Sequence, residues 1–492
     1  MKVDVVLVNT RQENFQQGIF SLGNSRKNQP LDLALAAAVL EKQGLKAKII
    51  DANLLRFSHQ KVAAMILKEQ PKIVIINTAA IDRWECPLPT IAQPSLLAKT
   101  IKEKFPQVRL IAIGPHGTVA PKWVLKKCPA IDVLVRGEPA ITLQKIIKKQ
   151  PLPKILGISF RHHGQIISNH SRPYLDNLDS LPLPAYHLLP MKLYGPLSDH
   201  FNGEKFTGQT HPFSIILTSR GCPGRCTFCF KKMYQDNKTY RFRSPKSVVD
   251  EIEFLVKKYS VRAIYIQDLS FCVIPERVMS ICREIGRRKL NFSWGCEARF
   301  DSISPPLLRA MKKAGCSFIN FGLESGSEKI IFQCQKNIKI EVIKKAIADC
   351  QKVNIAVGCF KLLGLPGETR GTFKETLAFL LKNKIAIPYP FPLNLPLPYP
   401  GTPLHQQAEK QFRTKITWKN APQFAGRVGT NFFDQVTVEE IQRLTYQYQL
   451  KQNGKNKDKH FYRLLMKEKI AKLKSFPKKL LISLGKRSFS KR

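Results

Sequence analysis

The chain has few acidic residues, no long apolar run and no apolar leader at its start. Its 492 residues contain 36 Asp and Glu against 80 Lys and Arg, a net charge of +44. The lack of any 18-residue apolar run argues against a transmembrane helix. Residues 1–8 resemble a buried strand with no small-residue cleavage site behind it, so we expect no signal peptide. Length and composition predict a cytoplasmic protein of two or three globular domains.

The sequence also lacks paired cysteines outside one short stretch. Nine of its 12 cysteines form no C-x2-C pair, so we expect buried thiols in a reducing compartment, without disulfides or a second cluster. Cys222, Cys226 and Cys229 form a C-x3-C-x2-C spacing on a loop with glycine and proline. Three thiolates leave one position of a four-ligand centre open. The stretch predicts either an iron–sulfur cluster with one substitutable iron or a zinc loop with a distant fourth ligand.

The basic excess is spread along the chain. Residues 455–492 hold 14 basic and 2 acidic residues, so +32 of the net charge of +44 lies before them. A diffuse excess indicates general surface basicity and does not favour a nucleic-acid partner. In this basic tail, residues 461–473 predict a cationic helix and residues 480–484 are apolar. The tail either contacts the inner face of an anionic membrane as a peripheral segment or caps the preceding domain.

The first 150 residues alternate short apolar runs with helical patterns. This order predicts an α/β domain with a doubly wound parallel sheet of flavodoxin or Rossmann type, with ligands at the carboxyl ends of its strands. Polar, glycine-bearing loops follow the fourth and fifth runs. The expected strands are residues 3–9, 46–52, 72–77, 108–114 and 131–136, and the expected helices are residues 31–43, 62–69, 96–104 and 141–149.

A connecting region, a second β/α series and a helical extension follow. In the connector, residues 151–210, we expect a β-hairpin turning at Gly164 and then a proline-rich linker. Residues 211–405 predict a partial (β/α)6 barrel with its site at the carboxyl ends of the strands, and residues 406–492 a basic, helical extension that includes a helix over 438–449. The expected barrel strands are residues 214–218, 263–267, 291–296, 318–321, 356–363 and 393–397.

The cysteine loop and the segments behind it resemble the radical S-adenosylmethionine (SAM) enzymes. In that family three cysteines hold a [4Fe–4S] cluster, the fourth iron binds SAM, and an electron from the cluster cleaves SAM to a 5′-deoxyadenosyl radical. The resemblance makes Cys222, Cys226 and Cys229 the catalytic and cluster-binding residues, and Phe228 matches the family's aromatic position.

Further segments imply the SAM contacts. Asp268 matches the first acid of a D-D-x-F-type segment, and Leu269 stands at the position of the second acid. Arg299 is expected to pair with the SAM carboxylate, and a G-x-E-S-G segment and a G-L-P-G-E-T segment to contact the ribose, methionyl and adenine groups. In those two segments the implied contacts are Glu324, Ser325, Gly364, Pro366 and Gly367.

The N-terminal half and the L-D-x-L-P-x-P-A connector resemble the cobalamin-binding part of a radical SAM group. That group includes anaerobic Mg-protoporphyrin ester cyclase and cobalamin-dependent methyltransferases. The cobalt-ligating histidine of a D-x-H-x-x-G segment is absent, since the first histidine is His59. We expect cobalamin bound base-off without a histidine ligand; the alternative is a structural flavodoxin-like domain. The implied cobalamin contacts are Gly114, Gly117, Thr118, Gly137 and Glu138.

These resemblances imply radical chemistry on an unidentified organic substrate. The expected reaction is methylation, cyclisation or oxidation of an unactivated carbon in a lipid- or tetrapyrrole-like molecule, with an electron donor of flavodoxin or ferredoxin type. Two alternatives stay open. One is an RNA-modifying, methylthiotransferase-like enzyme, which would bind RNA through its basic surface, although only Cys86 and Cys128 precede the cysteine loop. The other is a non-catalytic cobalamin or SAM sensor.

Overall fold

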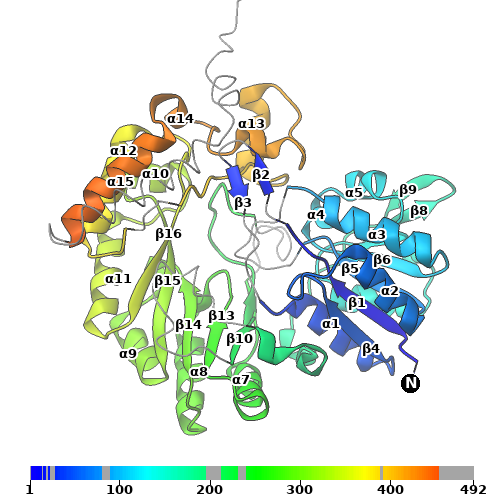
Figure 1. The fold of residues 1–492 in the computed structure, drawn as a ribbon. Helices are drawn as coiled ribbons and strands as arrows, with labels where there is room; N and C mark the ends of the chain where they lie inside the picture. The colour runs from blue at the N-terminus through cyan, green and yellow to red at the C-terminus, as the bar shows by residue number, and fades with distance from the viewer. Residues whose placement is uncertain are drawn as a thin grey trace, which may run out of the picture.

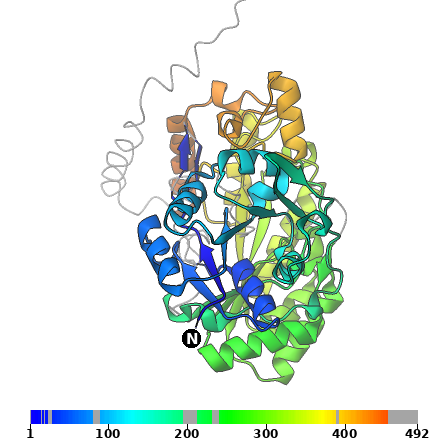
Figure 2. The same cartoon turned by 90° about the vertical axis from the view of Figure 1, so that its right-hand side faces the viewer.

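Two α/β lobes lie side by side, and C-terminal helices cover one end of the second lobe (Figure 1). The structure is a computed structural model that describes residues 2–13, 15–17, 20–22, 28–79, 89–194, 212–230, 240–387 and 392–453. The basic tail predicted over residues 455–492 and Cys86 lie outside this described part. Seen after a turn of 90°, the N-terminal lobe lies in front of the second lobe (Figure 2).

The sheet of the N-terminal lobe has seven strands in the order β4-β1-β5-β6-β7-β8-β9. The first five pair in parallel, which confirms the doubly wound prediction, and β8 and β9 add an antiparallel hairpin that turns at Gly164. All five residues of β1 are buried, as expected for a parallel strand between helices. The strands are β1 Val5–Asn9, β4 Ala47–Asp51, β5 Ile73–Asn77, β6 Arg109–Ile113, β7 Val133–Val135, β8 Ile158–His162 and β9 Gln165–Ser168.

Helices cover both faces of this sheet. We predicted a loop after β6, and this prediction is wrong in one respect, because two short helices follow the strand there. Pro115 and Pro121 occupy their first positions, where a missing N–H costs nothing and the fixed φ suits a helix. The helices are α1 Leu31–Glu41, α2 His59–Glu69, α3 Ala92–Lys104, α4 Pro115–Val119, α5 Pro121–Lys127 and α6 Pro139–Ile147, and a separate strand pair is formed by β2 Phe15–Gln17 and β3 Phe20–Leu22.

The second lobe contains a parallel sheet of five strands in chain order, β10-β13-β14-β15-β16. This confirms the β/α series as a partial barrel. The strands are β10 Phe213–Ile216, β13 Ala263–Ile266, β14 Ser293–Ala298, β15 Cys316–Glu324 and β16 Ala356–Lys361, with the short pair β11 Ser219–Arg220 and β12 Arg241–Phe242. The helices are α7 Pro245–Tyr259, α8 Pro275–Arg287, α9 Pro305–Lys313, α10 Glu328–Gln333, α11 Ile340–Lys352 and α12 Arg370–Lys382.

A sixth barrel strand, predicted over residues 393–397, does not form in the described residues. Prolines at 392, 396, 398 and 400 lack the N–H groups that a ladder needs. The segment still follows the sheet edge, because the Leu363 N–H donates to the Asn394 carbonyl at 2.8 Å.

The connector and Gln29 tie the lobes together. The Gln29 side chain donates to the Phe213 carbonyl at 2.9 Å and accepts from the Ile215 N–H at 3.2 Å. It therefore pairs with the outer edge of β10 as a neighbouring strand would. From the connector, the Tyr194 hydroxyl donates to Asp51 at the end of β4 at 2.7 Å.

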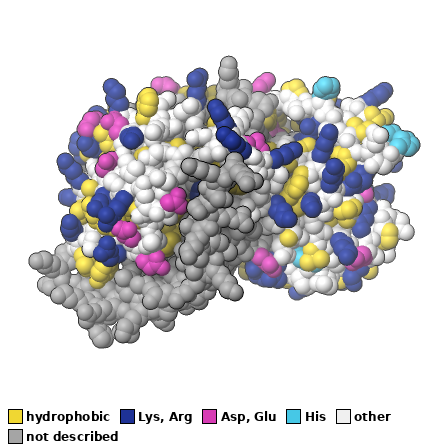
Figure 3. Space-filling view, turned by 90° about the horizontal axis from the view of Figure 1, so that it is seen from above, with side chains coloured by type: hydrophobic (Ala, Val, Ile, Leu, Met, Phe, Trp, Pro, Cys, Tyr) yellow, Lys and Arg dark blue, Asp and Glu magenta, His cyan; other side chains and the backbone are white. Residues whose placement is uncertain are grey.

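Three helices follow the second sheet: α13 Pro403–Phe412, α14 Phe432–Gln435 and α15 Val438–Asn453. The last confirms the predicted helix and packs on α12, where Arg370 pairs with Glu440 at 2.6 Å. On the described part of the face in Figure 3, Lys and Arg side chains are spread over both lobes, in agreement with a diffuse basic excess. Of the helices in the described ranges, none combines the length and apolar character that a membrane crossing requires.

Candidate functional site

The three predicted cluster cysteines lie on one loop at the carboxyl end of β10. All three thiols are partly buried. Backbone bonds hold the loop: the Thr227 N–H donates to the Cys334 carbonyl at 3.0 Å, and the Leu404 N–H donates to the Thr227 carbonyl at 3.0 Å. The loop is therefore fixed between the segment after α10 and the start of α13.

The charges around the loop are cationic. Burial raises the pKa of the Cys226 thiol, while Lys336 and Arg299 act to lower it. An added Cβ at Gly224 would lie 3.1 Å from Nη1 of Arg299, so this glycine lets the guanidinium approach the loop. Cationic neighbours favour the thiolates that iron needs as ligands.

The zinc alternative finds no support in the described residues. Nowhere in those ranges do three His, Cys, Asp or Glu side chains come together closely enough to hold one metal ion. Ligands of a single zinc must all lie within about 2.3 Å of it, whereas cysteines of a four-iron cluster bind different irons and stand farther apart. A cluster therefore does not require the close three-ligand grouping that a single zinc ion does.

Glu324 forms a buried ion pair with Lys336 beside this loop. The Nζ and Oε1 atoms are 2.9 Å apart, and both side chains are at most 10% exposed. Burial acts to lower the pKa of Lys336, but attraction to Glu324 and Cys226 outweighs it, so the lysine stays charged. Glu324 has a left-handed φ of 64°, a strained conformation typical of functional sites, and the missing side chain of Gly322 makes room for the pair. Lys336 follows α10 outside any motif, so no sequence pattern marks it.

The remaining predicted SAM residues surround the same end of the sheet. Arg299 donates to Asp301 at 2.9 and 2.7 Å and to the Lys336 carbonyl at 3.1 Å. Ser325 is buried and lies 3.1 Å from the Thr376 hydroxyl of α12. The structure thus brings Arg299, Glu324 and Ser325 to the neighbourhood of the cysteines.

Asp268 lies at the end of β13, beside the start of the cysteine loop. Its carboxylate is fully buried at the end of β13 and accepts four hydrogen bonds, from the backbone N–H and hydroxyl groups of Thr218 and Ser219, at 2.5 to 3.0 Å. Each oxygen is thereby already satisfied twice. Asp268 therefore anchors the start of the cysteine loop, and its contact with SAM stays a prediction.

The G-L-P-G-E-T segment forms a tight turn against the C-terminal part of the chain. Gly364 and Gly367 have φ of 80° and 78°, and an added Cβ at Gly364 would meet the backbone of Gly426 at 2.4 Å. Inside the turn, Glu368 accepts from the Gly364 and Leu365 N–H groups, and burial raises its pKa to about 7. The turn ends in a capping box that starts α12.

Phe228 and Pro366 link the turn to its surroundings. Phe228 packs against a small buried cluster of Ile330, Cys334 and Leu365, so the predicted aromatic position contacts the turn. Pro366 packs against Gly429. An added Cβ at Gly429 would lie 2.7 Å from the flexible Gln407 side chain and 3.0 Å from Cβ of Pro366. Gly364, Pro366 and Gly367 therefore all contact the C-terminal segment around Gly426 and Gly429.

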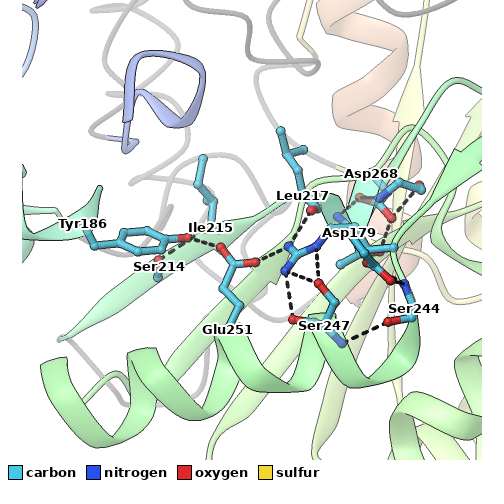
Figure 4. A network of polar contacts seen from close by, with 12 residues as sticks. Asp179, Tyr186, Ser214, Ile215, Leu217, Ser244, Ser247, Glu251 and Asp268 are labelled. Atoms are coloured by element: carbon cyan, nitrogen blue, oxygen red, sulfur yellow. Dashed lines mark hydrogen bonds and ion pairs between the residues drawn. The ribbon is translucent and has the colours of Figure 1, made fainter. Parts of the chain in front are cut away.

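A second polar network fixes the base of the loop (Figure 4). Glu251 of α7 accepts from the Tyr186 hydroxyl at 2.5 Å and pairs with Arg243. Arg243 also donates to the Leu217 carbonyl at 3.2 Å and to the Ser247 hydroxyl. Burial, reinforced by Glu251, raises the pKa of Tyr186, so its hydroxyl stays protonated and donates. The connector and α7 thus position the residues just before the cysteines.

In the N-terminal lobe, two of the predicted cobalamin glycines, Gly114 and Gly117, allow close packing. An added Cβ at Gly114 would meet the Thr78 hydroxyl at 2.6 Å, and one at Gly117 would meet the Leu134 side chain at 2.5 Å. The Thr118 hydroxyl donates to the Gly114 carbonyl at 3.0 Å and accepts from the Gly137 N–H at 2.9 Å. These bonds tie the ends of β6 and β7 together.

Glu138, the fifth predicted cobalamin residue, forms ion pairs across the two lobes. Its carboxylate pairs with Arg220 at 2.9 Å and with Arg241 at 2.6 Å, both from the second lobe. The three side chains are 5 to 12% exposed. Glu138 is thus saturated by arginines and joins the N-terminal lobe to a residue two positions before Cys222.

The carboxyl edge of the N-terminal sheet carries a buried polar network. Asn9 donates to Asp51 at 2.8 Å, and Asn77 donates to Asn9 at 2.9 Å. Burial raises the pKa of Asp51, against hydrogen bonds that lower it. Asn9 stands where the family's loop with the cobalt-ligating histidine would begin.

Aromatic rings join this edge to the cysteine loop. The His116 ring lies 4.6 Å from that of Trp418, which lies 5.8 Å from the ring of Phe230, next to Cys229. The indole N–H of Trp418 is buried and makes no hydrogen bond among the described residues. A donor left over at the junction of both lobes fits a polar group bound between them.

Comparisons with known proteins agree with this arrangement. The family model described as "Radical SAM superfamily" matches residues 216–380, and that described as "B12 binding domain" matches residues 26–147. The chain is 31% identical over 384 residues to an uncharacterized methyltransferase of Pyrococcus horikoshii, covering 77% of this chain and 78% of that protein. It is 28% identical to the anaerobic magnesium-protoporphyrin IX monomethyl ester cyclase of Cereibacter sphaeroides, over 78% of this chain and 60% of the cyclase.

A solved structure has the same fold. The radical S-adenosylmethionine methyltransferase TsrM from Kitasatospora setae, with tryptophan and a SAM analogue bound, superposes with a TM-score of 0.62. The match covers 84% of this chain and 77% of TsrM at 16% identity. The chain therefore belongs to the radical SAM enzymes with a cobalamin-binding domain, a family of methyltransferases and cyclases, and its cofactors are a [4Fe–4S] cluster, SAM and cobalamin.

Proposed function

We propose that this enzyme methylates an unactivated carbon of an organic substrate, with cobalamin bound base-off between the two lobes. One observation carries the proposal: the loops at the carboxyl edge of the N-terminal sheet reach the cysteine loop, through Glu138 with Arg220 just before it and through His116 with Trp418, whose ring contacts Phe230. A group bound at one edge is thus close to chemistry at the other. The name of the Pyrococcus horikoshii relative supports methylation over cyclisation.

The residues present fit the cofactors. Cys222, Cys226 and Cys229 would hold the cluster, and Lys336 and Arg299 would attract the negatively charged thiolates and the SAM carboxylate. Glu324 would orient SAM while its charge is balanced by Lys336. When bound, the cluster and SAM supply radical chemistry and cobalamin supplies a transferable methyl group.

The chain's own part is positioning and shielding. Asp268 and Arg243 hold the strand end that leads into the cysteine loop, and Glu138 holds the N-terminal lobe against it. The loop that begins at Asn9, residues 9–14, contains no histidine, so we propose a cobalt without a protein histidine ligand. We further propose an electron donor of flavodoxin or ferredoxin type and contact of the basic tail with a membrane. The proposed domain boundaries lie at residues 150, 210 and 405.

Product analysis separates methylation from cyclisation. The purified chain is reconstituted anaerobically with iron, sulfide and cobalamin, reduced, and given SAM with a cell extract as the substrate source. A methyltransferase should form both S-adenosylhomocysteine and 5′-deoxyadenosine, because one SAM gives its methyl group and another yields the radical. A cyclase should form 5′-deoxyadenosine alone, and that result would overturn the proposal.

Single cysteine variants provide the control. C222A, C226A and C229A should each abolish both products and lower the iron content. C128A makes the same change at a buried cysteine of the N-terminal lobe and should keep both. Equal activity in all four variants would rule out the cysteine loop as the cluster site.

A further inference from the structure

A cavity of about 650 Å³ opens where the N-terminal lobe, the connector and the cysteine loop meet. Its wall contains Thr118 and Gly137 from the ends of β6 and β7, the connector residues 171–177, and Arg220 and Gly401 from the second lobe. The volume lies within the range of about 300–1,000 Å³ that is usual for organic ligands. Arg220, two positions before Cys222, is the wall residue that lies nearest in sequence to the cluster cysteines.

The wall carries more positive than negative charge that is free to act on a ligand. Arg136 and Arg172 both line the cavity, and burial lowers the pKa of both guanidinium groups. Within the described ranges neither forms an ion pair with a carboxylate. The charge of Glu138 is balanced by Arg220 and Arg241, and the other acid of the wall, Asp176, is exposed.

Arg172 is the arginine best placed to bind. Its Nε–H donates to the Thr142 hydroxyl of α6 at 2.9 Å, which fixes the plane of the guanidinium. Its two terminal nitrogens form no hydrogen bond with the described residues. Gly157 allows this arrangement, because an added Cβ there would lie 3.2 Å from Cβ of Arg172. Arg136, in contrast, already donates to the Ile158 and Asn169 carbonyls of the hairpin.

The start of α6 adds a positive potential to the same wall. Ala140 and Ile141, in the first turn, line the cavity, and the Glu138 side chain at the N-cap makes no capping bond. The N–H groups of an uncapped first turn lack acceptors and favour an anion nearby. Arg172 and the helix start therefore act on the same space.

We propose that this cavity binds an oxyanion of the substrate, a carboxylate or phosphate, with Arg172 as its main ligand and Arg136 and the start of α6 in support. A planar guanidinium with two free terminal nitrogens suits a two-point contact with such a group. The substrate would then be an organic acid whose remaining part extends past Arg220 toward the cysteine loop. This assignment rests on the proposed function, since it names the class of molecule that the same site acts upon.

Inorganic phosphate is the probe, and its affinity for the full chain is measured by calorimetry. R172Q and R172K should each weaken binding by about tenfold or more, as expected for a lost hydrogen bond to a charged group. R172K keeps the charge but not the fork, and so it separates geometry from net charge. K148Q removes a charge from the exposed other end of α6 and should stay within about twofold of the wild type. Equal affinity of R172Q and wild type, or no binding by the wild type, would overturn the proposal.

A second measurement decides between substrate and cofactor as the source of the oxyanion. Cobalamin carries a phosphodiester in its nucleotide tail, and cobinamide lacks that tail. If R172Q leaves the affinities for both unchanged, the site belongs to the substrate as proposed. If R172Q weakens cobalamin alone, the site belongs to the cofactor and the substrate assignment is wrong. Failure of the proposed function would look different, because a chain that cleaves no SAM would still bind phosphate in an arginine-dependent way.

Discussion

Replacing Glu138 by glutamine should weaken the attachment of the N-terminal lobe to the second lobe. The carboxylate compensates two arginines, and all three side chains are 5 to 12% exposed. Removing one partner of a buried ion pair leaves charge uncompensated and costs about 3–5 kcal/mol. We therefore expect E138Q to lower the free energy of unfolding by that order. The side chains of the pair Lys48–Glu69 are 40% and 21% exposed. E69Q should therefore lower the free energy of unfolding by less than about 1 kcal/mol.

Urea unfolding followed by circular dichroism measures both variants, and a double-mutant cycle isolates the contact. E138Q and R241Q should couple by more than about 1 kcal/mol, because both remove the same 2.6 Å ion pair. The role of this ion pair is refuted if E138Q lowers the free energy of unfolding no more than E69Q does and shows no coupling to R241Q. In that case the pair is open to water in solution and does not hold the lobes together.

The remaining predictions concern the turn before α12 and the ion pair beside the cysteines. Burial raises the pKa of Glu368 to about 7, against an ordinary 4.5. Its contribution of about 3 kcal/mol to the free energy of unfolding is therefore fully present below pH 4.5 and is lost as the pH rises to about 7. E368Q should remove this loss of stability. If the free energy of unfolding falls equally steeply with pH for E368Q and wild type between pH 5 and 7, the prediction is contradicted. G364A should cost more in thermal stability than G44A, because both glycines have φ of 80° but only Gly364 faces backbone at 2.4 Å; equal costs would show that the clash is absent. K336M leaves Glu324 charged and buried and should lower both stability, by about 3–5 kcal/mol, and iron content after reconstitution, whereas K344M on the exposed face of α11 should change neither.

Regular patterns made much of the fold predictable. Parallel strands between helices are buried on both faces, so β1, β5 and β6 stand out as apolar runs, and the cysteine spacing marks the loop after β10. The predicted strand over residues 393–397 failed because its prolines cannot donate to a ladder, although its apolar character resembles that of a strand.

The partners of single charged residues could not be predicted. Asp268 and Glu138 were expected to face SAM and cobalamin, but Thr218 and Ser219 satisfy the first and Arg220 and Arg241 the second. Those contacts join residues 49 to 103 positions apart, and no local pattern specifies them. Lys336 and Arg172 were missed for the same reason, since their importance comes from burial beside a cavity or an opposite charge.

The cysteine loop should hold a [4Fe–4S] cluster whose open iron binds SAM. Electron paramagnetic resonance of the anaerobically reconstituted and reduced chain tests it without knowledge of the substrate. The account predicts the signal of a reduced [4Fe–4S] cluster whose g values shift when SAM is added, and no such signal in C222A, C226A or C229A. A signal that SAM leaves unchanged, or one that survives loss of any of the three cysteines, would contradict it.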